Sequence, residues 1–213
     1  MQGFAASVLV LVALASPANA QPANSPLGQV VGQAVDQVER VYTPLDLKKC
    51  RHRPGREVED YGSWRCAGHD GIAVHITAGD QRSYISYGPN AANEPAAQQT
   101  LSAFNSEGKT IEWRIERLPN GKPHAFATVL RWNVTALDPD NDLKQVAGQV
   151  LVVTRLGPGG VCHVGYVDGR ANPNANELAA ELADKHARAF KCGKDKPITL
   201  GIQGKGFSGL YGG

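Results

Sequence analysis

The chain has 213 residues, 42% of them apolar, and its 22 Lys and Arg residues nearly balance 20 Asp and Glu residues, for a net charge of +2. This length and composition suffice for a buried core and argue against wholesale disorder, and the 24 Gly and 13 Pro residues are too few for a low-complexity polymer. So small a net charge supplies no overall field toward nucleic acid or an anionic membrane, so any such interaction must be local.

The first 20 residues have the pattern of a secretory signal peptide. An uncharged run from Gly3 to Ala15 precedes a Ser-Pro break and the small-x-small triplet that ends at Ala20. No Lys or Arg precedes the run, which departs from the usual pattern, and the run is too short to span a bilayer as an uncleaved anchor. We expect cleavage after Ala20 and a mature protein without a transmembrane segment.

The segment after the leader predicts an amphipathic helix. Ser25 is a suitable N-cap, and Pro26 suits the first helical position. Apolar side chains then recur at helical spacing, at Leu27, Val31, Val35, Val38 and Tyr42.

A dense cluster of charge follows in a predicted loop over residues 48–60. Its basic members come first, and three acidic residues follow directly. The basic members are Lys48, Lys49, Arg51, Arg53 and Arg56. Two interpretations stay open: a site for an anionic partner, or a solvated loop whose two halves neutralise each other. No aromatic residue alternates with the basic ones, so the cluster does not indicate a nucleic-acid platform.

Short β-like runs come next, at residues 63–66, 72–77 and 82–87. They contain the best candidates for catalysis, His69, Asp70 and His75. His75 alternates with apolar neighbours, which is more typical of an exposed strand histidine than of a general base. A hydrolase that uses these three residues is therefore the alternative function and not the preferred one.

The middle of the chain predicts a long hairpin. Residues 88–108 suit a loop or a short helix, and residues 110–117 then alternate cleanly between apolar and charged side chains. The Asn120-Gly121 pair is a turn signal, and residues 125–134 return with alternating apolar side chains.

The C-terminal third predicts a buried strand pair and a covering helix. Residues 149–156 and 161–167 are apolar on both faces and flank a Gly-rich turn, so they belong at the centre of a sheet. Residues 176–190 predict an amphipathic helix that covers this pair. Residues 194–213 suit an added edge strand or a Gly-rich tail, which leaves residues 21–193 as a single domain.

Four cysteines predict two disulfides in an oxidising compartment. We favour the two local pairings, Cys50 with Cys66 and Cys162 with Cys192, although crossed pairings stay open. The second bond would fix the C-terminal helix to the strand that it covers. A zinc site is not expected, because paired thiolate ligands at short spacing are missing.

Residues 138–142 begin like a calcium-binding loop, with Asp138, Asp140 and Asp142 at alternate positions. The match then fails, because Leu143 stands where glycine permits the turn and Gln149 stands where a glutamate closes the shell. A polar loop between strands is the preferred interpretation, and we expect no metal and no cofactor.

Together these patterns predict an α+β fold: one twisted antiparallel sheet of about six or seven strands, with an N-terminal helix and a disulfide-tied C-terminal helix. The function that they favour is a secreted, non-enzymatic binding module of the bacterial envelope or periplasm, an inhibitor or an envelope-associated factor. Its partner would be a protein or an anionic envelope component that contacts the basic cluster.

Overall fold

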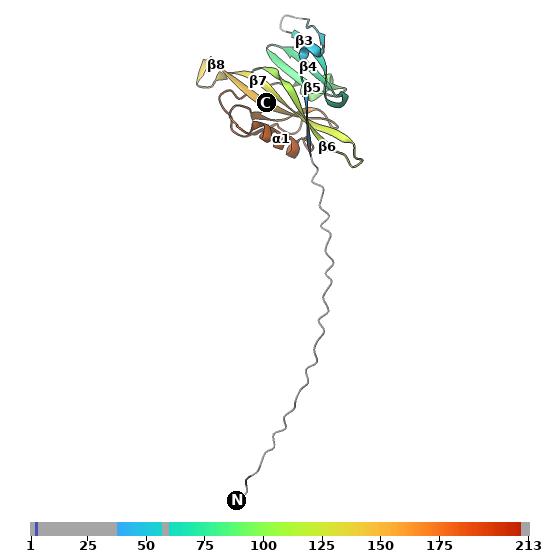
Figure 1. The fold of residues 1–213 in the computed structure, drawn as a ribbon. Helices are drawn as coiled ribbons and strands as arrows, with labels where there is room; N and C mark the ends of the chain where they lie inside the picture. Colours follow the sequence, from blue (N-terminus) through green and yellow to red (C-terminus); the bar gives the residue numbers. More distant parts are fainter. Residues whose placement is uncertain (1–2, 4–37, 57–59, 210–213) are drawn as a thin grey trace. The chain divides into compact units, whose positions relative to one another are not determined.

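A computed structural model describes Gly3 and residues 38–56 and 60–209. The expected leader and most of the expected N-terminal helix lie outside these residues. The described part of the chain forms two β-sheets, four short 3-10 helices and one α-helix (Figure 1).

The larger sheet has six strands in the order β1-β6-β7-β8-β9-β10. Neighbours are antiparallel, except that β10 runs parallel to β9 at the edge. The strands are β1 (Glu39–Pro44), β6 (Phe104–Arg117), β7 (Pro123–Asp138), β8 (Asn141–Arg155), β9 (Cys162–Asp168) and β10 (Ile198–Leu200). The predicted hairpin is confirmed as β6 and β7, which turn at Gly121 in a left-handed conformation with φ of 77°.

The smaller sheet is an antiparallel meander in the order β2-β3-β4-β5. Its strands are β2 (Arg51–Arg53), β3 (Asp60–Ala67), β4 (Ala73–Gly79) and β5 (Arg82–Tyr87). The 3-10 helices lie before β2, between β3 and β4, and between β5 and β6. They are η1 (Leu47–Lys49), η2 (His69–Gly71), η3 (Ala91–Asn93) and η4 (Pro95–Gln98).

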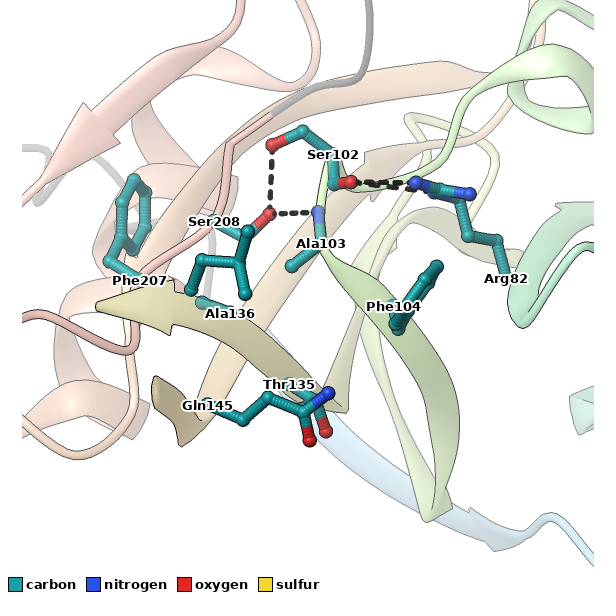
Figure 2. A pocket seen from close by; sticks show the side chains of 10 residues that line it. Arg82, Ser102, Ala103, Phe104, Thr135, Ala136, Gln145, Phe207 and Ser208 are labelled. Atoms are coloured by element: carbon teal, nitrogen blue, oxygen red, sulfur yellow. Dashed lines mark hydrogen bonds between the residues drawn. The ribbon is translucent and has the colours of Figure 1, made fainter. Parts of the chain in front are cut away.

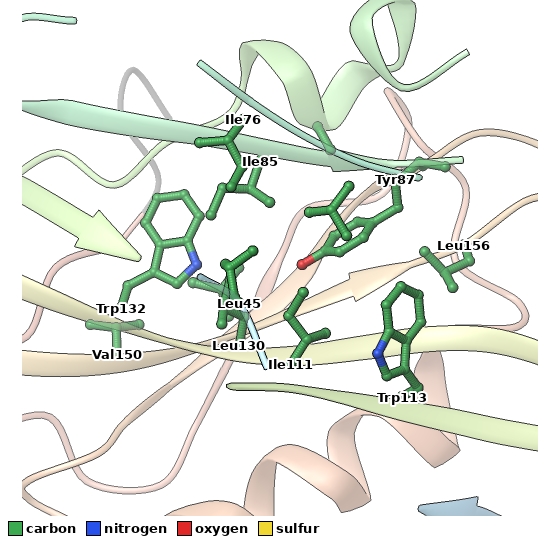
Figure 3. Close-up of a cluster of buried hydrophobic side chains, with 14 of the residues drawn as sticks. Leu45, Ile76, Ile85, Tyr87, Ile111, Trp113, Leu130, Trp132, Val150 and Leu156 are labelled. Atoms are coloured by element: carbon green, nitrogen blue, oxygen red, sulfur yellow. The ribbon is translucent and has the colours of Figure 1, made fainter. Parts of the chain in front are cut away.

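The main core lies between the two sheets (Figure 3). Val74 and Ile76 from β4 and Tyr87 from β5 face residues of β6 and β7, and all are almost completely buried. Tyr87 meets Trp113 edge to face, with ring centroids 5.7 Å apart. The apolar side of the meander is thus buried by face-to-face packing.

A second core lies on the opposite face of the larger sheet, under α1 (Ala175–His186). Small residues such as Ala179 and Ala183 let the helix approach the strands, and Leu182 is fully buried there. The disulfide between Cys162 and Cys192 joins β9 to the segment that follows the helix. Both disulfides therefore have the local pairing favoured by the sequence.

The prediction of one sheet of six or seven strands with an N-terminal helix is wrong, because the described residues form ten strands in two sheets. The meander packs its apolar face onto the larger sheet and does not extend that sheet at an edge. At the N-terminal end, residues expected to complete a helix form β1, where Val41 pairs with Trp113. Pairing with β6 overrides the helical spacing that reaches Tyr42.

No helix among residues 38–56 and 60–209 is long and apolar enough to cross a membrane. Two disulfides and this finding are compatible with a secreted, disulfide-stabilised protein.

Candidate functional site

The first disulfide fixes β2 onto the edge of the smaller sheet. Cys50, which directly precedes β2, is bonded to Cys66 of β3, and their Cα atoms are 4.5 Å apart. In antiparallel strands the next residues are also opposite each other, and Arg51 pairs with Arg65. Since Cys66 is buried toward the core, side-chain alternation places both arginines on the outer face of the sheet.

The two arginines continue into a row across three strands. β4 places His75 opposite Arg65, and we call Arg51, Arg65 and His75 the arginine row. Both arginines are exposed, and neither has a carboxylate within ion-pair distance in the part of the chain that the structure describes. Like charges directly opposite on neighbouring strands repel each other and destabilise a sheet. The row therefore concentrates positive charge that no carboxylate of the described residues neutralises.

The pKa of His75 reflects the positive electrostatic potential around the row. Its partial burial, and then the positive charge of Arg65, lower the pKa of His75 below its ordinary value. A histidine with a lowered pKa is uncharged at neutral pH, so Arg51 and Arg65 carry the charge of the row. An anion held against the row would favour the imidazolium and raise this pKa again.

The other basic residues of the predicted loop lie around the row. Arg53, also exposed, is opposite Ser63 in the next outward-facing row. Lys48 and Lys49 lie in η1, where Lys49 is 4.0 Å from the carboxylate of Asp46. Arg56 follows β2, just before residues 57–59, which lie outside the described part. Part of the expected loop is thus strand β2, which orders Arg51 and Arg53.

The three candidate hydrolase residues do not converge. His69, in η2, lies against the ring of Trp113 at a centroid distance of 6.1 Å, on the side where the meander meets the larger sheet. His75 lies on the outer face of β4, whereas its neighbours Val74 and Ile76 are buried in the core on the other face. Asp70 is exposed on the turn. A base and its orienting carboxylate must lie within hydrogen-bond distance, and no such contact joins these described residues.

The aspartates that resemble a calcium loop form the turn between β7 and β8. The ammonium group of Lys205 lies 3.1 Å from Asp138 Oδ1 and 2.5 Å from Asp140 Oδ2. The backbone N–H of Asp140 donates a hydrogen bond to Asp138, and this bond and Lys205 lower the pKa of Asp138. A side-chain cation of the protein itself thus neutralises this pair and ties the C-terminal segment to the hairpin.

A groove lies between β6, the β7–β8 hairpin and the C-terminal segment (Figure 2), and its volume is about 380 Å³. Three of its polar residues, Arg82, Ser102 and Ser208, already form hydrogen bonds within the protein. The guanidinium of Arg82 pairs with Asp80 at 2.6 Å and lies over the ring of Phe104. The hydroxyls of Ser102 and Ser208 are 3.1 Å apart. No histidine lines this groove to activate either serine, so its contacts serve to dock the C-terminal segment.

Arg65 is the main member of the site that the sequence analysis missed. It lies in the run at residues 63–66, between two side chains that alternate toward the core, so its outward direction was predictable. Its position opposite Arg51 also follows from the disulfide, because a bond between Cys50 and Cys66 across antiparallel strands sets the register of their neighbours.

Comparisons with protein-family models, with curated proteins and with solved structures gave no match for this chain. The functional argument therefore rests on the residues of the chain itself.

Proposed function

We propose that this protein is a secreted, non-catalytic binding module of the bacterial envelope or periplasm. In this proposal residues 1–20 are a signal peptide that is removed, and the outer face of the smaller sheet holds an anionic polymer of the envelope. Two disulfides in a chain of this size support export to an oxidising compartment.

One observation carries the choice of partner: Arg51 and Arg65 lie opposite each other, exposed, with no carboxylate of the described chain within ion-pair distance. Guanidinium groups bind phosphate, sulfate and carboxylate through paired hydrogen bonds. A partner with regularly spaced anionic groups would neutralise both arginines, while Arg53, Lys48 and Lys49 extend the contact along the sheet edge. Coulombic attraction across such an exposed face weakens as salt increases.

The test is binding of the disulfide-bonded protein to dextran sulfate, with uncharged dextran as the reference polymer. We expect binding to dextran sulfate alone, with an affinity that decreases as ionic strength rises. The double variant Arg51→Ser/Arg65→Ser should weaken it at least tenfold. The matched control Arg117→Ser/Lys122→Ser, on the exposed β6–β7 turn, removes the same charge and should change it little.

A direct readout comes from His75. Its NMR titration should move to higher pH when dextran sulfate binds, because the added negative charge offsets Arg65. Equal weakening in the two double variants would contradict the proposal, since it would assign binding to net charge alone. Salt-independent capture of an envelope protein by the same face would show that the partner is a protein and not a polyanion.

A further inference from the structure

A second concave site lies on the larger sheet, on the face that α1 partly covers. It has a volume of about 390 Å³, and β1, β6, β7, β8 and the first turn of α1 contribute to it. Val129 and Leu151 supply apolar lining, and polar side chains surround them. We call it the Arg131 pocket. A concave site with an apolar floor and a few polar groups that converge on it is the usual form of a small-ligand site.

A bulge in β6 opens this pocket. The register between β6 and β7 shifts between Glu107 and Ile111, so Gly108, Lys109 and Thr110 do not follow the regular pairing. Gly108 has no side chain, and a Cβ atom there would lie 2.4 Å from the carbonyl oxygen of Arg131. The bulge therefore brings the two backbones together and leaves the side chain of Arg131 without a regular cross-strand neighbour on β6.

Arg131 is a partly buried cation whose protein partners are neutral. It donates hydrogen bonds to Gln149 Oε1 at 3.1 Å and to Asn176 Oδ1 at 2.9 Å, and no carboxylate of the described residues is within ion-pair distance. Burial lowers the pKa of Arg131, because nothing nearby compensates the lost hydration. Such a cation binds a ligand carboxylate strongly.

The acidic residue of the pocket does not offset this charge. Glu112 is 7% exposed and receives hydrogen bonds from Arg114 at 2.8 Å and from the hydroxyl of Tyr42 at 3.2 Å. Arg40 lies 3.8 Å away on the other side. Glu112 is therefore neutralised within the protein, and Arg131 and Lys109 leave the pocket with a positive balance.

The remaining polar groups suit hydroxyl groups. Asn133 and Asn176 each accept a hydrogen bond at the amide oxygen, and no acceptor in the described part of the chain bonds to either NH2 group. Thr110 adds a hydroxyl at the bulge. The ring of Tyr42, which is 56% exposed, can cover the apolar face of a sugar ring, as aromatic side chains do.

We propose that the Arg131 pocket binds a small sugar acid, with its carboxylate on Arg131 and its hydroxyls on Asn133, Asn176 and Thr110. This site is separate from the arginine row, so it stands whether or not the row binds a polyanion. The apolar contacts of Val129, Leu151 and Tyr42 distinguish the expected ligand from a simple inorganic anion.

The test is an NMR titration of the labelled, disulfide-bonded protein with D-galacturonate, and with galactose and acetate as references. We expect saturable shifts of the backbone amides of Lys109 and Asn176 with galacturonate, and binding of galactose and acetate at least tenfold weaker. Arg131→Gln should weaken galacturonate binding at least tenfold. Arg117→Gln, which removes an exposed cation outside the pocket, should not change it.

A second variant keeps the proposal testable if Arg131→Gln does not fold. Asn133 is exposed on β7, so Asn133→Trp should fold and block the pocket sterically. The proposal fails if galactose or acetate binds as tightly as galacturonate, if galacturonate causes no saturable shifts, or if both pocket variants retain binding. Arg51→Ser/Arg65→Ser should leave galacturonate binding unchanged, which separates this test from that of the arginine row.

Discussion

On the face of the larger sheet covered by α1, Arg114 is 2% exposed and bonds to two carboxylates, whereas Arg51 and Arg65 on the smaller sheet face each other in solvent. Arg114 donates to Asp184 of the helix at 2.9 and 2.5 Å and to Glu112 at 2.8 Å. The same residue type thus fixes a helix to one sheet, and on the other it has no carboxylate partner among the described residues.

The difference lies in the carboxylates around each arginine, which come from its own strand and from the helix above it. Arg114 alternates with Glu112 and Glu116 on β6, and α1 supplies the carboxylate of Asp184 above them. Glu116 repeats the arrangement: burial alone would raise its pKa, but hydrogen bonds from Arg188 and His124 lower it. Arg51 and Arg65 are exposed on the outer face of the smaller sheet, and no carboxylate of the described residues pairs with them there.

The largest effect should come from breaking the buried network. Burial alone would lower the pKa of Arg114, but Asp184 and Glu112 raise it above its ordinary value. Arg114→Met leaves Glu112 and Asp184 without this cation, and we expect a loss of about 3 kcal/mol in the free energy of unfolding, at the low end for buried pairs because Asp184 is partly exposed. Urea unfolding measures it.

Two controls sharpen that result. Lys185→Gln removes the exposed pair with Glu181 on the same helix and should change stability by less than about 0.5 kcal/mol. Adding Glu112→Gln and Asp184→Asn to Arg114→Met should recover part of the loss, because the uncompensated carboxylates are gone. An Arg114→Met protein as stable as the native one would show that the network does not hold the helix.

An effect of intermediate size on the free energy of unfolding should come from His163, a buried group without an ion pair. His163 lies between the sheets, 1% exposed, with Nδ1 3.0 Å from the hydroxyl of Tyr166. Burial lowers its pKa to about 3. In the unfolded chain the ordinary pKa of histidine is about 6.5, so between these values the unfolded state binds a proton that the folded state does not. Stability from this residue is complete above that range and is lost as pH falls through it.

Between about pH 7 and pH 5, His163 should account for a loss on the order of 1 to 2 kcal/mol. Carboxylates titrate mostly below this window, and His75, whose pKa is also lowered, contributes in the same direction, so the share of His163 is obtained from urea unfolding of its variant at the two pH values. His163→Gln should reduce the difference between the two pH values, even if it lowers stability at both. His186→Gln, exposed at the end of α1, should retain the larger share of it. The same pH difference in His163→Gln as in the native protein would contradict the assignment.

Local patterns predicted most strands, because strand formation depends on alternation that the chain itself displays. They could not show whether these strands belong to one sheet or to two. The apolar faces around Val74 and Trp113 satisfy either one wide sheet or two packed sheets, and only the tertiary contacts between them decide. The helical spacing up to Tyr42 failed for the same reason, since pairing with β6 is a contact distant in sequence.

The candidate site was likewise predicted from the sequence only in part. Arg51 and Arg53 were identified as charge in sequence, but the charge of Arg65 became relevant only through its pairing with Arg51. The Arg131 pocket had no signal in the sequence. It depends on a bulge in β6 and on the first turn of α1, and neither the shift in register nor the approach of Asn176 can be read from local spacing.

The smallest effect on the free energy of unfolding should come from the two exposed arginines of the smaller sheet. Arg51→Ser/Arg65→Ser removes a repulsion between exposed side chains, so the free energy of unfolding should stay unchanged or rise by a few tenths of a kcal/mol. The measurement is urea unfolding at low and at high salt, where the small gain should shrink as salt screens the repulsion. A loss above about 1 kcal/mol would mean that the arginines stabilise the meander through their aliphatic stems. Their exposure would then have a structural cause, and the reason to assign this face to a partner would be gone.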